Sequence, residues 1–138
     1  MYNYQIVTHR PGVEYSSPHF FILSKGNNSG KPANTPWVNS FVCISESEKE
    51  SKILYWGAYF LFKNKSIYRL LKGSVILFVS IREYKKEFSS YLYHVENAQK
   101  KFTKSAILLE RLNKQKKYMQ QYLSQLDMMM QSVASTKF

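Results

Sequence analysis

The chain has 138 residues, of which 44% are hydrophobic and 16% aromatic, so it can bury the core of one domain. Cys43 is the only cysteine, which excludes an internal disulfide and a zinc site built from several cysteines. The longest apolar run, residues 53–62, is far shorter than the roughly 20 residues that a membrane-spanning helix needs. We therefore predict a single cytoplasmic domain, residues 1–138, with no secretion signal and no membrane partner.

The formal net charge is +11, and it is spread unevenly along the chain. Residues 99–138 hold eight basic and two acidic side chains, so more than half of the excess positive charge lies there. A concentrated positive charge favours a polyanionic partner, and a nucleic acid more than a membrane surface.

The first third of the chain has the pattern of short strands joined by loops. Strands are predicted at residues 2–7, 19–23 and 37–44, where apolar and polar residues alternate or aromatic and β-branched residues gather. The first of them is expected at an edge of the sheet. A loop rich in Gly, Asn, Ser and Pro, residues 24–36, separates the second strand from the third.

A helix start follows these strands. Ser45 and Glu48, and again Ser47 and Glu50, have the spacing of a capping box, in which a hydroxyl and a carboxylate satisfy unpaired backbone N–H groups. The helix is expected over residues 47–63. Because it is apolar all round, we predict that it is buried.

A further apolar run comes after this helix. One more turn is predicted near residues 67–71, and Gly73 then interrupts the chain. The continuous apolar run at residues 74–81 predicts a central strand covered on both faces, with Phe78 buried. With the three strands above, it makes a small sheet of about four strands.

From Ile81 onward, apolar residues recur every three or four positions, as they do on one face of a helix. The sustained seven-residue repeat is typical of helices that pack along one seam, and only Ser105 and Lys116 interrupt it. The apolar members of the series from Leu109 onward are called the seam. Its members are Leu109, Leu112, Met119, Leu123, Leu126, Met130 and Val133.

This helical C-terminal third, residues 82–133, completes a predicted α+β fold. A single helix of this length would be about 80 Å long, whereas a compact chain of this size is about 40 Å across. We therefore predict either a broken helix that folds back as a hairpin or a seam that pairs with another subunit. The seam is expected to be buried within the hairpin, against the sheet or across a dimer. The break is expected between Asn97 and Asn113, where Thr103 and Ser105 are further polar positions.

Three short segments carry a resemblance to a known family. They are residues 30–32 (Gly-Lys-Pro), 36–41 (Pro-Trp-Val-Asn-Ser-Phe) and 73–76 (Gly-Ser-Val-Ile). Over about residues 20–90, the chain resembles a family of uncharacterised short bacterial proteins associated with mobile elements. The family has no established activity, so the resemblance implies a bacterial cytoplasmic protein and assigns no functional residue.

The loop at residues 24–37 is the candidate ligand-binding loop, because it follows a predicted strand and contains Lys31 and Trp37. It does not fit a phosphate-binding P-loop. Three residues rather than four separate its two glycines, and Pro32 stands where a Ser or Thr is required. We interpret it as a surface connection held by Trp37.

No other group of residues has the spacing of a catalytic or metal site. His9, His19 and His94 are scattered along the chain, without the spacing of metal ligands. Cys43, in a predicted strand, is interpreted as a small buried hydrophobic residue rather than a nucleophile. The glutamates at 46, 48 and 50 are explained by the helix start rather than by acid–base chemistry. We predict no catalytic residue, no metal and no cofactor.

A row of basic residues lies opposite the seam. Lys100, Lys104, Arg111 and Lys114 repeat at spacings that place them on one helix face, with Lys117 close by. Such a basic stripe can follow a phosphate backbone, and each neutralised phosphate then releases counterions. A solvated face that keeps an exposed helix soluble explains the same residues.

Three classes of function remain open. The favoured one is a non-enzymatic accessory protein that self-associates or binds a partner through its C-terminal helices. The second is a nucleic-acid-binding module that uses the basic stripe. The third is a ligand-binding or enzymatic domain that uses the loop at residues 24–37.

Overall fold

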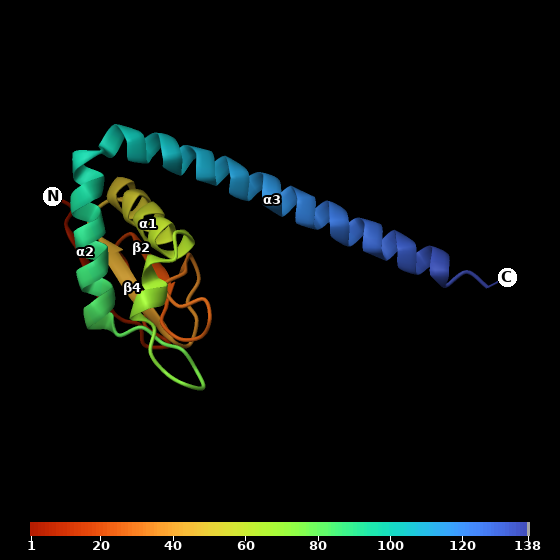
Figure 1. Ribbon diagram of the computed structural model, residues 1–138, viewed down its shortest axis with the longest axis horizontal. Helices are drawn as coiled ribbons and strands as arrows, with labels where there is room; N and C mark the ends of the chain where they lie inside the picture. Colours follow the sequence, from red (N-terminus) through yellow and green to blue (C-terminus); the bar gives the residue numbers. More distant parts are fainter. Residues whose placement is uncertain (138) are drawn as a thin grey trace. The chain divides into compact units, whose positions relative to one another are not determined.

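The computed structural model describes residues 1–137, in which four strands precede three α-helices (Figure 1). The fold class is therefore α+β, as the sequence predicts. The elements are β1 (Tyr4–Thr8), β2 (His19–Leu23), β3 (Pro32–Ala33), β4 (Ser40–Ser45), α1 (Glu48–Lys63), the 3-10 helix η1 (Ser66–Leu70), α2 (Ile81–Asn97) and α3 (Gln99–Ala134). The chain forms two compact units, of which the first is Met1–Ala98 and the second begins at Gln99.

The strands form one antiparallel sheet in the order β1-β4-β2-β3. β1 is an edge strand and β2 has the bounds that the sequence predicts. β4 begins at Ser40 rather than residue 37, because the Ser40 hydroxyl holds a turn there. Its Oγ accepts a hydrogen bond from the Trp37 N–H at 2.9 Å and donates one to the Trp37 carbonyl at 2.7 Å. The fourth strand is the two-residue β3, which comes from the predicted loop.

The cap at Ser47 explains where α1 begins. The Oγ of Ser47 accepts a hydrogen bond from the Glu50 backbone N–H at 3.2 Å, so the second of the two capping boxes is the one used. Glu48 and Glu50 also interact favourably with the positive end of the helix dipole. None of residues 53–62 is exposed, which confirms the predicted buried helix.

The main core lies between one face of the sheet and the helices α1 and α2, which pack against each other (Figure 1). Alternate residues of the strands point toward these helices, as the period of two requires. Core residues from the sheet are Ile6, Phe20, Ile22, Phe41 and Cys43, and those from α1 and α2 are Leu54, Ala58, Leu61, Tyr84, Phe88 and Leu92. The two helices approach closely at Gly57, where a Cβ atom would lie 3.3 Å from Leu92 Cδ2.

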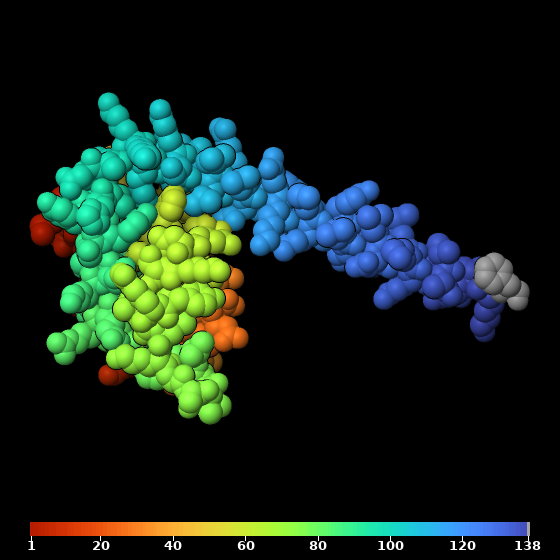
Figure 2. Space-filling model, in the orientation of Figure 1, coloured from red at the N-terminus to blue at the C-terminus, as the bar shows by residue number. Residues whose placement is uncertain are grey.

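The predicted strand at residues 74–81 is wrong. The segment is a loop that projects from the first unit, and it is drawn in yellow-green to green at the lower end of the molecule in Figure 2. Val75 is 92% exposed, Ile76 63% and Phe78 38%, so the burial predicted for Phe78 is also wrong. Within the run, Val79 alone is fully buried.

Local pairing explains why this apolar run forms a loop. The backbones of Lys72 and Phe78 exchange two hydrogen bonds of 2.9 Å, which close the loop at its base. Gly73 has a φ of +104°, a conformation that glycine adopts without strain. Ser80 then caps α2, because its Oγ accepts a hydrogen bond from the Glu83 N–H. The pairing of Lys72 with Phe78 turns residues 73–77 back on themselves, so they do not extend as a strand of the sheet.

The helical third of the chain is broken at Ala98, within the interval that the sequence predicts. Ala98 has a φ of −125°, and its N–H bonds to the Val95 carbonyl at 3.1 Å, which ends α2. α2 contacts α1, η1 and β1, so it extends the strand-rich body that we expected over residues 1–81. α3 then continues for 36 residues, which corresponds to a length of about 54 Å.

Candidate functional site

The seam lies entirely on α3, and it is mostly exposed. Leu109 is half-buried. The exposed fractions of the other members are 49% for Leu112, 67% for Met119, 59% for Leu123, 36% for Leu126, 68% for Met130 and 71% for Val133. The chain itself therefore leaves this apolar surface accessible to a partner.

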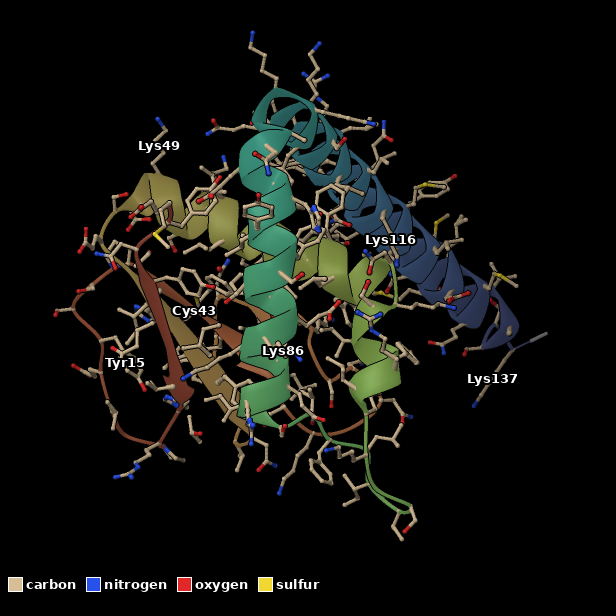
Figure 3. The ribbon with its side chains drawn as sticks, turned by 60° about the vertical axis from the view of Figure 1, so that its left-hand side comes forward. Tyr15, Cys43, Lys49, Lys86, Lys116 and Lys137 are labelled. Carbon is tan, nitrogen blue, oxygen red and sulfur yellow. The ribbon has the colours of Figure 1, made fainter. Side chains whose placement is uncertain are left out.

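Charge divides α3 into two different halves. Residues 99–117 hold seven basic side chains and one acidic one, whereas residues 118–134 hold Asp127 and no basic side chain. Lys116 occupies a position in the series that the seam follows, and its side chain is exposed on α3 (Figure 3). The net charge of residues 99–138 does not reveal this contrast, because it averages over both halves of the helix. Counting basic residues separately in the two halves of the predicted helix reveals it from the sequence.

The basic stripe also lies on α3. Lys100, Lys104, Arg111, Lys114 and Lys117 are all exposed. The ion pairs described within residues 1–137 join other residues, so these five side chains are not neutralised by a carboxylate. By their helical spacing they lie away from the seam, so one helix presents an apolar face and a basic face.

The loop at residues 24–37 does not resemble a phosphate cradle in its hydrogen bonding. A phosphate loop presents free backbone N–H groups to its ligand. Here four of these groups bond to carbonyl oxygens of the chain at 2.7–3.1 Å, and they belong to Gly26, Ser29, Gly30 and Lys31. Lys31 is exposed, and the backbone of Trp37 is held by the turn at Ser40. No hydrogen bond described within residues 1–137 joins the side chains of these two candidate ligand residues.

Cys43 lies on β4 with its side chain in the main core (Figure 3). Burial raises the pKa of its thiol to about 12, so the nucleophilic thiolate is scarce at neutral pH. Glu48 and Glu50 lie in the first turn of α1, where the cap accounts for them. The Glu46 carboxylate accepts a hydrogen bond from the Asn3 side chain. These positions agree with structural roles.

Two of the three histidines lie together on the sheet face opposite the helices. The rings of His9 and His19 flank Phe21 at centroid distances of 5.0 and 5.3 Å, and the Tyr15 hydroxyl lies 3.0 Å from His9 Nδ1. The His19 Nδ1–H donates to the Ser17 carbonyl at 2.8 Å. Among residues 1–137, no group of three or more His, Cys, Asp and Glu side chains is placed to hold a metal ion.

No helix within residues 1–137 combines the length and apolar character that a bilayer crossing requires.

Comparison with known proteins places the chain in a family. No curated protein and no solved structure matches the chain. One family model matches residues 6–136, which is nearly the whole chain and more than the segment whose resemblance the sequence indicates. The chain therefore belongs to the family of unknown function DUF6943.

Proposed function

We propose that this protein is a cytoplasmic, non-enzymatic accessory protein of a bacterium that self-associates through the seam of α3. The observation that carries the proposal is the exposed seam, which runs from Leu109 to Val133 at the spacing of a coiled coil. Contiguous apolar surface of this kind on a protein in water marks an interaction site.

A second copy of α3 is the partner that this surface fits. In a coiled coil, each apolar side chain inserts between side chains of a facing helix that has the same repeat. The chain supplies such a helix itself, over a seam of more than three heptads. Burying a Leu or Met side chain completely stabilises by roughly 1.5–3 kcal/mol, so the exposed seam members of two chains provide a substantial driving force.

The first experiment replaces Leu123 and Leu126 with Asp. We expect the double variant to be monomeric, because an unpaired carboxylate in an apolar interface costs several kcal/mol. The parent protein is expected to show twice the mass of one chain by analytical ultracentrifugation at about 10–100 μM, a range in which associations of moderate affinity are populated.

A control variant tests whether the loss of association depends on the seam or on negative charge added anywhere on the helix. Gln121 and Ser124 lie on the same turns but outside the seam, and both are exposed. Their replacement with Asp adds the same charge, and this variant is expected to keep the mass of the parent. A parent protein that is monomeric throughout the concentration range contradicts the proposal.

Nucleic-acid binding by the basic stripe is a second candidate function, supported by the exposure of its five side chains and the absence of carboxylate partners for them within residues 1–137. Four phosphate contacts, by Lys100, Lys104, Arg111 and Lys114, imply a slope of about −3.6 for log affinity against log salt on duplex DNA. Reversal of Lys104 and Arg111 to Glu is expected to remove about half of this slope.

The control for this measurement reverses two lysines elsewhere. Lys49 and Lys52 are exposed on α1, and their replacement with Glu changes the net charge by the same amount. We expect this variant to keep the slope of the parent. Failure to bind both duplex and single strands at about 50 mM salt, where phosphate contacts are strong, eliminates this candidate.

A further inference from the structure

We propose that the α3 helices of two copies pair in antiparallel orientation, with Lys116 of one copy beside Asp127 of the other. The inference rests on the proposed self-association and specifies its geometry. It follows from three features of α3: the exposed seam, the interruption of its apolar series by Lys116, and the confinement of basic residues to the first half of the helix.

Parallel pairing in register brings identical residues together. Lys116 of one copy then faces Lys116 of the other within the interface, and like charges in such a position repel. The two basic halves, each with seven basic side chains, lie side by side along their whole length. Asp127 is eleven residues further along, or about 16 Å, too far to neutralise Lys116.

Antiparallel pairing removes this conflict and covers the whole seam. With the seams in full overlap, every seam member except Leu126 meets an apolar residue of the second copy, and Leu126 faces Lys116. The facing positions are Leu109 with Val133, Leu112 with Met130, Lys116 with Leu126, and Met119 with Leu123. A shift by one heptad in one direction leaves Leu109 and Leu112 uncovered. A shift in the other direction places Met130 against the polar Ser105 and Val133 against Phe102, which is only 8% exposed.

The same register brings the two unusual charges together. Asp127 follows Leu126, the residue that faces Lys116, and it lies on the flank of the interface to which Lys116 is adjacent. In antiparallel coiled coils this flank meets its own counterpart on the other helix, so the ammonium and carboxylate groups come within reach of each other. The two-fold symmetry creates this pair twice. Overlap of the apolar positions and pairing of the charges therefore select one register independently.

The remaining basic residues also separate in this arrangement. Arg111, Lys114 and Lys117 of one copy lie alongside residues 118–134 of the other, a stretch without basic side chains. Lys100, Lys101 and Lys104 lie beyond the overlap. The repulsion between the two basic halves is thereby reduced, and the basic stripe of each copy faces solvent.

Cross-linking tests the orientation. Leu112→Cys and Met130→Cys are made separately, one with a tag that changes its mass, and treated with a short bifunctional thiol reagent. Antiparallel pairing predicts a cross-linked product from the mixture and none from either variant alone, because identical positions lie about 27 Å apart. The native Cys43 is buried and does not interfere. Products from each single variant, with none between them, show parallel pairing and overturn the inference.

Charge exchange provides a second measurement. Lys116→Glu and Asp127→Lys are each expected to raise the dissociation constant about tenfold, since two symmetric pairs are lost and replaced by repulsion. The double variant Lys116→Glu/Asp127→Lys restores the value to within about threefold of the parent. Lys117→Glu carries the same charge change outside the seam and leaves the constant nearly unchanged.

The two proposals fail in different ways. A parent protein that is monomeric overturns both the self-association and its geometry. A parent protein that is dimeric, but in which the double charge exchange does not restore association, contradicts the antiparallel register and leaves self-association standing.

Discussion

Replacement of Phe88 by alanine is expected to lower the free energy of unfolding by about 3–5 kcal/mol, the range for a fully buried phenylalanine. Phe88 is 0% exposed. Its ring stacks on that of Tyr84 at a centroid distance of 5.8 Å and meets Tyr4 edge-on at 5.5 Å. It also lies where α2 approaches α1 at Gly57, whose added Cβ would be 3.5 Å from Phe88 Cε2. Because α2 is held by its contacts with both β1 and α1, the surrounding residues cannot move in to fill the cavity that the alanine leaves.

Tyr84→Phe is the matched variant for this prediction. The Tyr84 ring belongs to the same cluster, but its buried hydroxyl has no hydrogen-bond partner in the described part of the chain. Removing this hydroxyl relieves an unsatisfied polar group and is expected to raise the free energy of unfolding by about 1 kcal/mol. Urea unfolding of both variants, followed by circular dichroism, measures the two changes. A loss below about 1 kcal/mol for Phe88→Ala contradicts the packing described for this core.

The elements that local signals specify could be predicted from the sequence. The bounds of β2 follow from its aromatic and branched residues, and α1 begins directly after Ser47 because a hydroxyl three residues before Glu50 can cap the helix. The break at Ala98 lies within the predicted interval, although no glycine or proline marks it. In each case the determining interactions are between residues close together in the chain.

The apolar run at residues 74–81 shows the limit of hydrophobicity as a signal. A short apolar run has the same pattern whether it forms a buried strand or an exposed loop. Ser80 and Glu83 have the capping spacing of Ser47 and Glu50, and this signal places a helix start inside the predicted strand. The pairing of Lys72 with Phe78 could not be predicted from the sequence, because it depends on how η1 and α2 pack against each other.

β3 could not be predicted, because it has no local pattern. It has two residues, and it is a strand only because Pro32 and Ala33 lie opposite Ile22 and Phe21 of β2. Proline is tolerated there because β3 is an edge strand. Its existence depends on the path of the loop before it, which long-range contacts determine.

The candidate site was predictable in its residues and not in its environment. Helical periodicity is local, so the seam members from Leu109 to Val133 could be named from spacing alone. Whether an apolar face is covered depends on the whole assembly, and the exposure of Met119 and Leu123 emerges only with the fold. Spacing alone also makes no distinction between a hairpin, a sheet and a second copy as the partner of the seam.

Gly30→Ala is expected to reduce the free energy of unfolding by about 2–4 kcal/mol, through two effects that add. Gly30 has a φ of +90°, a conformation that alanine adopts with strain. An added Cβ would also lie 3.0 Å from both Cγ1 and Cγ2 of Ile67, which is fully buried in η1. The glycine that gives this loop its likeness to a phosphate-binding motif therefore serves close packing of the loop against η1.

Gly26→Ala separates the two effects. Gly26 lies in the same loop with a φ of +93°, and an added Cβ meets no atom within 4 Å. Its replacement is expected to cost only the backbone strain, about 1–2 kcal/mol. In the background Ile67→Ala, which removes Cγ1 and Cγ2 and leaves the Ile67 Cβ position 3.2 Å away, the cost of Gly30→Ala should fall toward that of Gly26→Ala. Equal losses for the two glycine variants in the parent background would show that the loop and η1 are not in tight contact, and the glycine would then be required by its backbone conformation alone.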